Sequence, residues 1–124
     1  MKKQLNQVKD FHHKFGSPVL NSPSLIDLDR AAFRFKIMQE ELNEYIKGVE
    51  NGDLKNIAKE LSDLLYTVFG TIHEHGLGEV IEEVFNRTHA SNMSKDVPPS
   101  GTKGIKGKNY IEADLSDIFN KVNK

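Results

Sequence analysis

The chain contains no cysteine, which excludes disulfide bonds and thiolate metal sites. It also has no apolar run near the roughly 20 residues that a membrane-spanning helix requires. The N-terminal Met-Lys-Lys-Gln-Leu-Asn leads into no secretory hydrophobic segment. A formal net charge of −1 gives no overall attraction to nucleic acid. We therefore expect a cytoplasmic protein with no membrane and no nucleic-acid partner.

Apolar residues are also in short supply. They make up 37% of the 124 residues, which is little for a compact monomer of this size. The length fits one domain spanning residues 1–124. We expect that domain to complete its core by forming a homodimer or homotetramer.

The apolar residues that are present recur mostly at helical spacing. Together with glycine, proline and polar residues as boundary signals, the spacing predicts helices over about residues 2–15, 27–50, 54–75, 77–93 and 114–122. The turn Asn51-Gly52-Asp53 joins the second and third of these as an antiparallel hairpin. Residues 96–110 are rich in glycine and proline, so we expect a flexible segment there. The predicted fold class is all-α, a bundle of four to five helices around this hairpin, completed by oligomerisation.

Each helix of the hairpin carries an apolar stripe that is expected to face inward. On the second helix the stripe comprises Phe35, Met38, Leu42, Tyr45 or Ile46, and Val49. On the third helix it comprises Ile57, Leu61, Leu64, Leu65, Val68 and Ile72.

Four carboxylates border these stripes, as Glu41-x-x-Glu44 and Glu60-x-x-Asp63. The spacing of three residues places the two members of each pair on one helix face. Counted outward from the turn, the two pairs lie at nearly the same height in the hairpin. Four anions so close repel one another unless a cation lies among them, and all-oxygen ligands suit Mg²⁺ or Mn²⁺. The sequence therefore predicts a metal site, with a solvated acidic face as the alternative.

A di-iron carboxylate bundle is the competing metal site. It requires Glu-x-x-His on two helices, and no histidine of this chain follows a glutamate by three residues. The absence of that motif favours Mg²⁺, with Mn²⁺ as the alternative, over iron or zinc.

Several segments resemble a known superfamily. They are Gln39-Glu40-Glu41-Leu42-Asn43-Glu44, Ala58-Lys59-Glu60-Leu61-Ser62-Asp63-Leu64-Leu65-Tyr66, Ser91-Asn92-Met93-Ser94-Lys95 and Lys106-Gly107-Lys108-Asn109-Tyr110. Together they resemble the all-α nucleoside triphosphate pyrophosphatases, which include MazG proteins, dimeric dUTPases and phosphoribosyl-ATP pyrophosphohydrolases. The resemblance is to the branch that is similar to phosphoribosyl-ATP pyrophosphohydrolase. The stretch between Lys95 and Lys106 is shorter than usual for that branch, and residues 111–114 lack an expected proline.

The resemblance implies a role for each matching residue. Glu41, Glu44, Glu60 and Asp63 would bind Mg²⁺, and Glu40 would orient or deprotonate the attacking water. Substrate binding would fall to a set of residues nearer the C-terminus: Asn92, Lys95, Lys106, Lys108 and Tyr110.

The activity that these roles imply is Mg²⁺-dependent hydrolysis of a (deoxy)nucleoside triphosphate to a monophosphate and pyrophosphate, a house-cleaning reaction. Phosphoribosyl-ATP is the alternative substrate. A non-catalytic helical dimerisation module is the alternative from another functional class.

Overall fold

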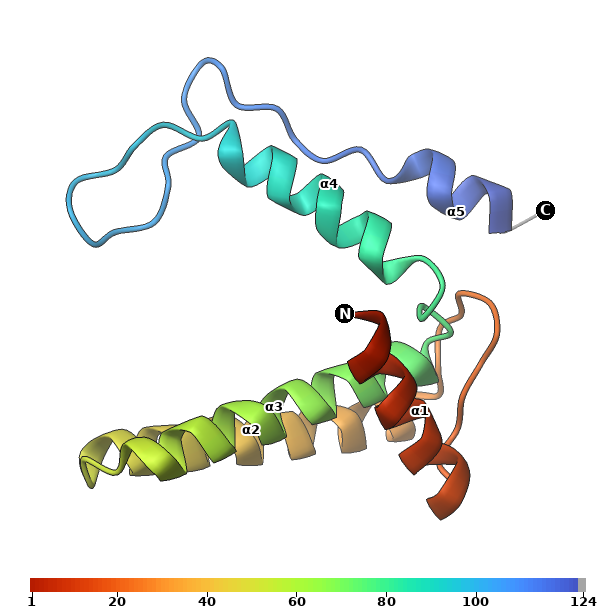
Figure 1. The fold of residues 1–124 in the computed structure, drawn as a ribbon. Coiled ribbons are helices and arrows are strands. Elements are labelled where there is room, and N and C mark those ends of the chain that lie inside the picture. The colour runs from red at the N-terminus through yellow and green to blue at the C-terminus, as the bar shows by residue number, and fades with distance from the viewer. Residues whose placement is uncertain (123–124) are drawn as a thin grey trace. The chain divides into compact units, whose positions relative to one another are not determined.

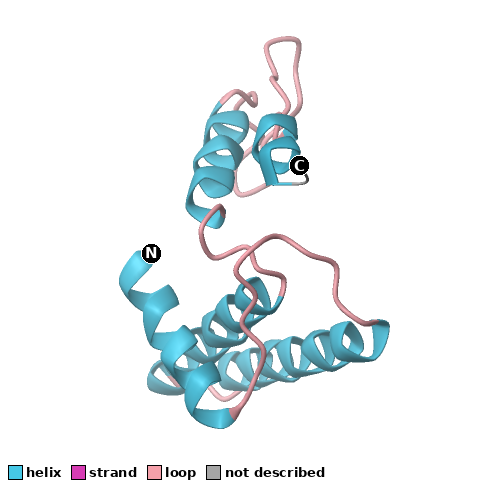
Figure 2. Cartoon of the chain, turned by 90° about the vertical axis from the view of Figure 1, so that its right-hand side faces the viewer, coloured by secondary structure: helices cyan, strands magenta, loops and turns pink. Residues whose placement is uncertain are grey.

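The computed structural model describes residues 1–122, and their regular secondary structure is helical (Figures 1 and 2). The helices are α1 (Lys2–Phe15), α2 (Leu28–Glu50), α3 (Leu54–Glu74), α4 (Ile81–Met93) and α5 (Ser116–Val122). Extended pairing within this range is limited to an isolated bridge between Asp96 and Ile105. None of the helices in the described range is long and apolar enough to cross a membrane. The predicted all-α class is confirmed.

Local sequence signals set the helix ends. The side chains of Asp27 and Asp53 accept hydrogen bonds from backbone amides in the first turns of α2 and α3. Gly16 ends α1 with a φ of 74°, in the left-handed region that favours glycine. Four of the predicted helices agree with the observed ones to within about two residues, which is the usual uncertainty of helix ends.

The predicted start of the fourth helix at Leu77 is wrong, because α4 begins at Ile81. The amide of Leu77 instead donates to the carbonyl of Ile72, and that of Gly76 donates to His73. Both amides therefore cap the C-terminal end of α3, with Gly76 at a φ of 67°. A second glycine, Gly78, follows before the new helix can begin.

The chain divides into two compact units, Met1–Gly78 and Glu79–Lys124, which are described separately. In the first unit α2 and α3 run antiparallel and side by side, and α1 packs against α3 (Figure 1). In the second unit the chain after α4 turns back through a long loop to α5. The single domain expected over residues 1–124 stays a prediction.

The seam between α2 and α3 includes polar side chains and a glycine. At the end away from the turn, the guanidinium of Arg34 donates to the hydroxyl of Thr71 and the carbonyl of Thr67. Near the turn, Gly48 lets the backbones approach, since a Cβ atom there would lie 3.2 Å from Cγ1 of Ile57. The inward positions of α2 thus fall one residue away from most of the predicted apolar stripe.

The prediction that the apolar stripes face inward is therefore wrong for most of the α2 stripe, and for two of the six positions of the α3 stripe, within a single chain. Exposed members are Phe35, Leu42, Ile46, Val49, Leu61 and Leu65. The physical reason is that polar side chains and glycine occupy the seam, so the apolar positions beside it face outward.

A buried ion-pair network lies at the end of the hairpin away from the turn. Glu74 is completely buried. Its Oε1 lies 2.6 Å from Nε of Arg30, and its Oε2 lies 2.9 Å from Nη1 of Arg34. Gly70 lies beside it, where a Cβ atom would come within 2.5 Å of Arg34 and 2.6 Å of His12. Only glycine lets the three helices meet so closely at this point.

Contacts among α4, α5 and the loop between them stabilise the second unit. Arg87 of α4 forms ion pairs with Glu83 and with Asp117 of α5, and Ile118 is buried. Gly107 lies close to the carboxylate of Asp96, which would have to move if position 107 carried a side chain. Residues 96–110 form turns joined by the Asp96–Ile105 bridge, and their flexibility stays a prediction.

Candidate metal centre and substrate-binding residues

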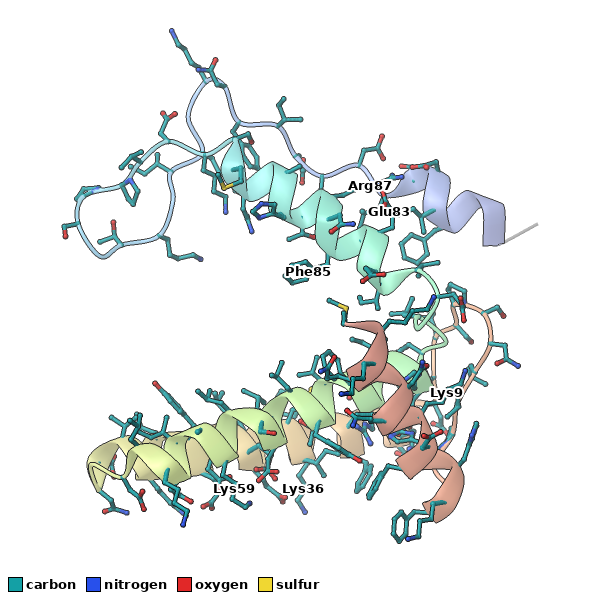
Figure 3. All side chains as sticks on the ribbon, in the orientation of Figure 1. Lys9, Lys36, Lys59, Glu83, Phe85 and Arg87 are labelled. Carbon is teal, nitrogen blue, oxygen red and sulfur yellow. The ribbon has the colours of Figure 1, made fainter. Side chains whose placement is uncertain are left out.

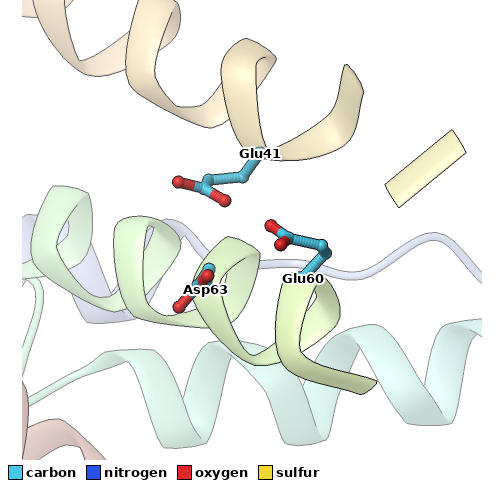
Figure 4. A group of neighbouring side chains, drawn as sticks. All are labelled: Glu41, Glu60 and Asp63. Atoms are coloured by element: carbon cyan, nitrogen blue, oxygen red, sulfur yellow. The ribbon is translucent and has the colours of Figure 1, made fainter. Parts of the chain in front are cut away.

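Three of the four predicted ligands come together in the first unit. Figure 4 shows Glu41 of α2 facing Glu60 and Asp63 of α3 across the seam. One carboxylate oxygen from each residue lies within 4.8 Å of the others. The hairpin register creates this cluster, because Glu60 and Asp63 lie one turn apart on α3.

The cluster is partly shielded from water. Glu60 is buried, with 7% of its surface exposed, whereas Glu41 and Asp63 are half-buried. Partial burial, a hydrogen bond with Glu60 and the negative charges of Asp63 and Glu60 together raise the pKa of Glu41. A raised carboxyl pKa is the expected result of crowding anions where solvent screens them poorly.

One cation already lies at the cluster. Nζ of Lys59 is 2.7 Å from Oδ2 of Asp63 and 3.9 Å from Oε1 of Glu60. The hydrogen bond with Asp63 and the charges of Asp63 and Glu60 raise the pKa of Lys59. Figure 3 places Lys59 on the α2–α3 hairpin, and its side chain is 68% exposed. The ammonium is therefore a mobile partner at the rim of the cluster.

The donor set fits a hard divalent cation. The cluster offers carboxylate oxygens from three residues and no nitrogen or sulfur. Such ligands suit Mg²⁺ and Mn²⁺, whereas zinc and copper favour imidazole or thiolate ligands. Burial of Glu60 and crowding at Glu41 supply the electrostatic reason to take up a cation.

The fourth predicted ligand, Glu44, lies outside this group. Its carboxylate accepts a hydrogen bond from Nζ of Lys47 at 3.2 Å, one turn further toward the hairpin turn. Glu40, the predicted catalytic residue, is exposed on α2 immediately before Glu41. Successive helical residues point about 100° apart, so Glu40 points away from the direction of Glu41 and is not one of the three clustered residues.

The predicted substrate-binding residues lie in the second unit. Asn92 is exposed in the last turn of α4, and the aliphatic part of the Lys95 side chain packs against Gly104. Nζ of Lys106 lies 5.3 Å from the ring centroid of Tyr110, in a cation–π contact, and Lys108 is exposed. The Tyr110 hydroxyl accepts a long hydrogen bond from Ser91 at 3.4 Å. Lys106 and Tyr110 therefore form one local group, close to Lys108 in sequence.

Lys59 was not among the predicted site residues, although it lies four residues before Asp63. Its spacing was the available signal, since an i, i+4 lysine and aspartate are neighbours on a helix. The structure adds that the same ammonium also approaches Glu60.

Comparison with known proteins identifies the family. Residues 8–92, well over half of the chain, match the phosphoribosyl-ATP pyrophosphohydrolase family model. No curated protein matches the chain. The matched range contains the three clustered carboxylates, Glu40, Glu44 and Asn92, and ends before Lys95.

The chain therefore belongs to the phosphoribosyl-ATP pyrophosphohydrolase family, within the MazG-like all-α nucleoside triphosphate pyrophosphatase superfamily. It is a nucleotide pyrophosphohydrolase, a hydrolase that acts on phosphoric anhydride bonds.

Proposed function

We propose that this family member cleaves the α–β phosphoric anhydride bond of its nucleotide with the help of Mg²⁺ held by Glu41, Glu60 and Asp63. The observation that carries the proposal is the convergence of these carboxylates from two helices within 4.8 Å. The family description makes phosphoribosyl-ATP the first substrate to test. A (deoxy)nucleoside triphosphate, cleaved in a house-cleaning role, is the alternative substrate for the same chemistry.

Each part of the site has a distinct task in this proposal. A bound divalent cation would supply Lewis-acid polarisation of the phosphates and neutralise their charge. Glu41, Glu60 and Asp63 hold that cation, and Glu44 joins them if its side chain leaves Lys47. Glu40, the residue before Glu41, orients the attacking water or accepts its proton.

The second unit carries the residues that we propose for substrate binding. Asn92 and Lys95 contribute an amide and an ammonium at the end of α4, and Lys106 and Lys108 add two more positive charges. Phosphate oxygens favour such donors, because charge-assisted hydrogen bonds are the stronger ones. Tyr110 keeps Lys106 in place through the cation–π contact.

Pyrophosphate release provides the direct test of activity. Phosphoribosyl-ATP and the deoxynucleoside triphosphates, including dUTP and dCTP, are assayed with Mg²⁺ for the wild-type chain and for Asp63→Asn. We expect at least one substrate to turn over, and Asp63→Asn to lower kcat by about 100-fold or more, since a metal ligand stabilises transition-state charge by several kcal/mol. Glu50→Gln, at an exposed acid of α2, should keep full activity.

Thermal unfolding tests the metal site without any substrate. Mg²⁺ should raise the Tm of the wild-type chain by mass action, and Glu41→Gln should abolish that shift. No pyrophosphate from any substrate, together with the same small Mg²⁺ shift in both proteins, would contradict the proposal and favour the non-catalytic helical module.

A further inference from the structure

Lys59 stands out because it is bound to residues that the proposed reaction needs for a metal. It pairs with Asp63 at 2.7 Å and approaches Glu60 at 3.9 Å. Among the described residues it is the lysine or arginine whose ion pairs reach the clustered carboxylates. A divalent cation that binds Oδ2 of Asp63 therefore competes with the ammonium for that oxygen.

The displacement is feasible because the ion pair is weakly held. The Lys59 side chain is 68% exposed and that of Asp63 is 38% exposed. Exposed pairs at i, i+4 on a helix contribute little to stability, since solvent screens them and the long side chain loses freedom. The flexible stem leaves the released ammonium near the site.

Charge balance gives the released ammonium a new partner. Three carboxylates and one divalent cation already carry net negative charge, and a nucleotide polyphosphate adds several further negative charges. Cations around the phosphates are what stabilise such a complex. The ammonium of Lys59 already lies at the carboxylate cluster, within reach of phosphates that bind a cation there.

We propose that Lys59 is a substrate-binding residue that exchanges partners. Its ammonium pairs with the carboxylate of Asp63 in the metal-free protein. Once the carboxylates hold a divalent cation, the ammonium binds the phosphates of the nucleotide instead. This inference rests on the proposed function, and it assigns phosphate recognition to a residue of α3 in the first unit.

The exchange predicts two effects of opposite sign in Lys59→Met, which keeps the bulk of the stem and removes the charge. Without nucleotide, Mg²⁺ should bind about two- to five-fold more tightly by calorimetry, because no ammonium competes for Asp63. In the pyrophosphate assay the KM for nucleotide should rise about ten-fold or more, with a smaller change in kcat, because a charged hydrogen bond to phosphate is lost.

Two further variants separate this role from general charge effects. Lys59→Arg keeps the charge and should hold the KM within about three-fold of wild type. Lys55→Met removes the same charge one turn earlier on α3 and should change neither quantity. Circular dichroism checks that each variant is folded.

The outcomes distinguish this inference from the function it rests on. An active wild-type enzyme whose Lys59→Met variant has an unchanged KM would refute the exchange, even if Mg²⁺ binding tightened. An equal rise in KM for Lys55→Met would refute it too. A wild-type protein that neither binds Mg²⁺ nor releases pyrophosphate would refute the proposed function, and the inference with it.

Discussion

His73 shows how burial changes the chemistry of one side chain in this molecule. It lies in the last turn of α3 with 4% of its surface exposed, and Nε2 is 2.7 Å from the carbonyl of Leu5 in α1. Since a carbonyl only accepts, the proton lies on Nε2 in the folded protein. Burial is the largest influence and lowers the pKa of His73, while the hydrogen bond to Leu5 opposes it.

This lowered pKa predicts that acid destabilises the fold. The unfolded chain takes up a proton near pH 6.5, the ordinary value for histidine, whereas folded His73 resists protonation until lower pH. The stabilising contribution is full above about pH 6.5 and is lost as the pH falls toward the folded pKa. Urea unfolding measured from pH 7.5 to pH 5 should therefore show a declining free energy of unfolding.

Variants identify the group responsible. His73→Gln should show a smaller decline over this range, although it starts from lower stability. His13→Gln, at an exposed position on α1, should retain the wild-type slope. Equal slopes for all three proteins would show that other groups cause the decline.

At the scale of the helices, ion pairs of the buried Glu74 join α2 to α3. Glu74 has no exposed surface and Arg34 has 5%, so their ion pair is largely removed from water. The donors of Arg34 that remain are satisfied by Thr71 and the carbonyl of Thr67. The same seam continues toward Glu41, so the network also helps to fix the register that brings Glu41 level with Glu60 and Asp63.

Glu74→Gln should therefore destabilise the chain by about 3–5 kcal/mol, because it leaves a buried guanidinium without its counter-charge. Urea unfolding in the absence of divalent cations measures this loss. Glu44→Gln is the matched control, since it breaks an exposed pair with Lys47 on the same hairpin and should cost less than about 1 kcal/mol. Similar losses for the two variants would contradict the structural role of the buried network.

Sequence periodicity could predict the helices and the acidic cluster, because both depend on local spacing. The turn Asn51-Gly52-Asp53 and the two acidic pairs were sufficient to bring Glu41 level with Glu60 and Asp63. Their roles as ligands stay a prediction, as do those of Glu40 and the residues after α4.

The buried network could not be predicted from hydropathy, because arginine and glutamate are usually expected at the surface. One signal was present. Arg34, Met38 and Glu41 are spaced by four and then three residues, so they lie on one face of α2, and this face is the one that packs against α3. The predicted stripe followed the neighbouring apolar positions instead, and those positions face out of the isolated chain.

At the scale of the whole molecule, the described part of the chain buries few apolar side chains. Within residues 1–119, the buried hydrophobic residues are Leu5, Val8 and Ile118. Phe35 is 64% exposed, Leu65 is 54% exposed, and an open pocket of about 360 Å³ between α1 and α3 is lined partly by Leu65 and Phe69. Large apolar surface of this kind is typical of chains that associate.

We therefore predict that the protein is a homo-oligomer whose interface includes the outward apolar stripe of α2. Light scattering after gel filtration should give the mass of a dimer or tetramer, and the Tm should rise with protein concentration. Phe35→Glu should shift the mass toward the monomer and lower the Tm, because it places a charge within an apolar interface. Asn43→Asp adds one negative charge at an exposed polar position of α2 beside the stripe and should leave the mass unchanged. A monomeric wild-type protein with a Tm independent of concentration would contradict this prediction and mean that the apolar stripe of α2 stays exposed to water.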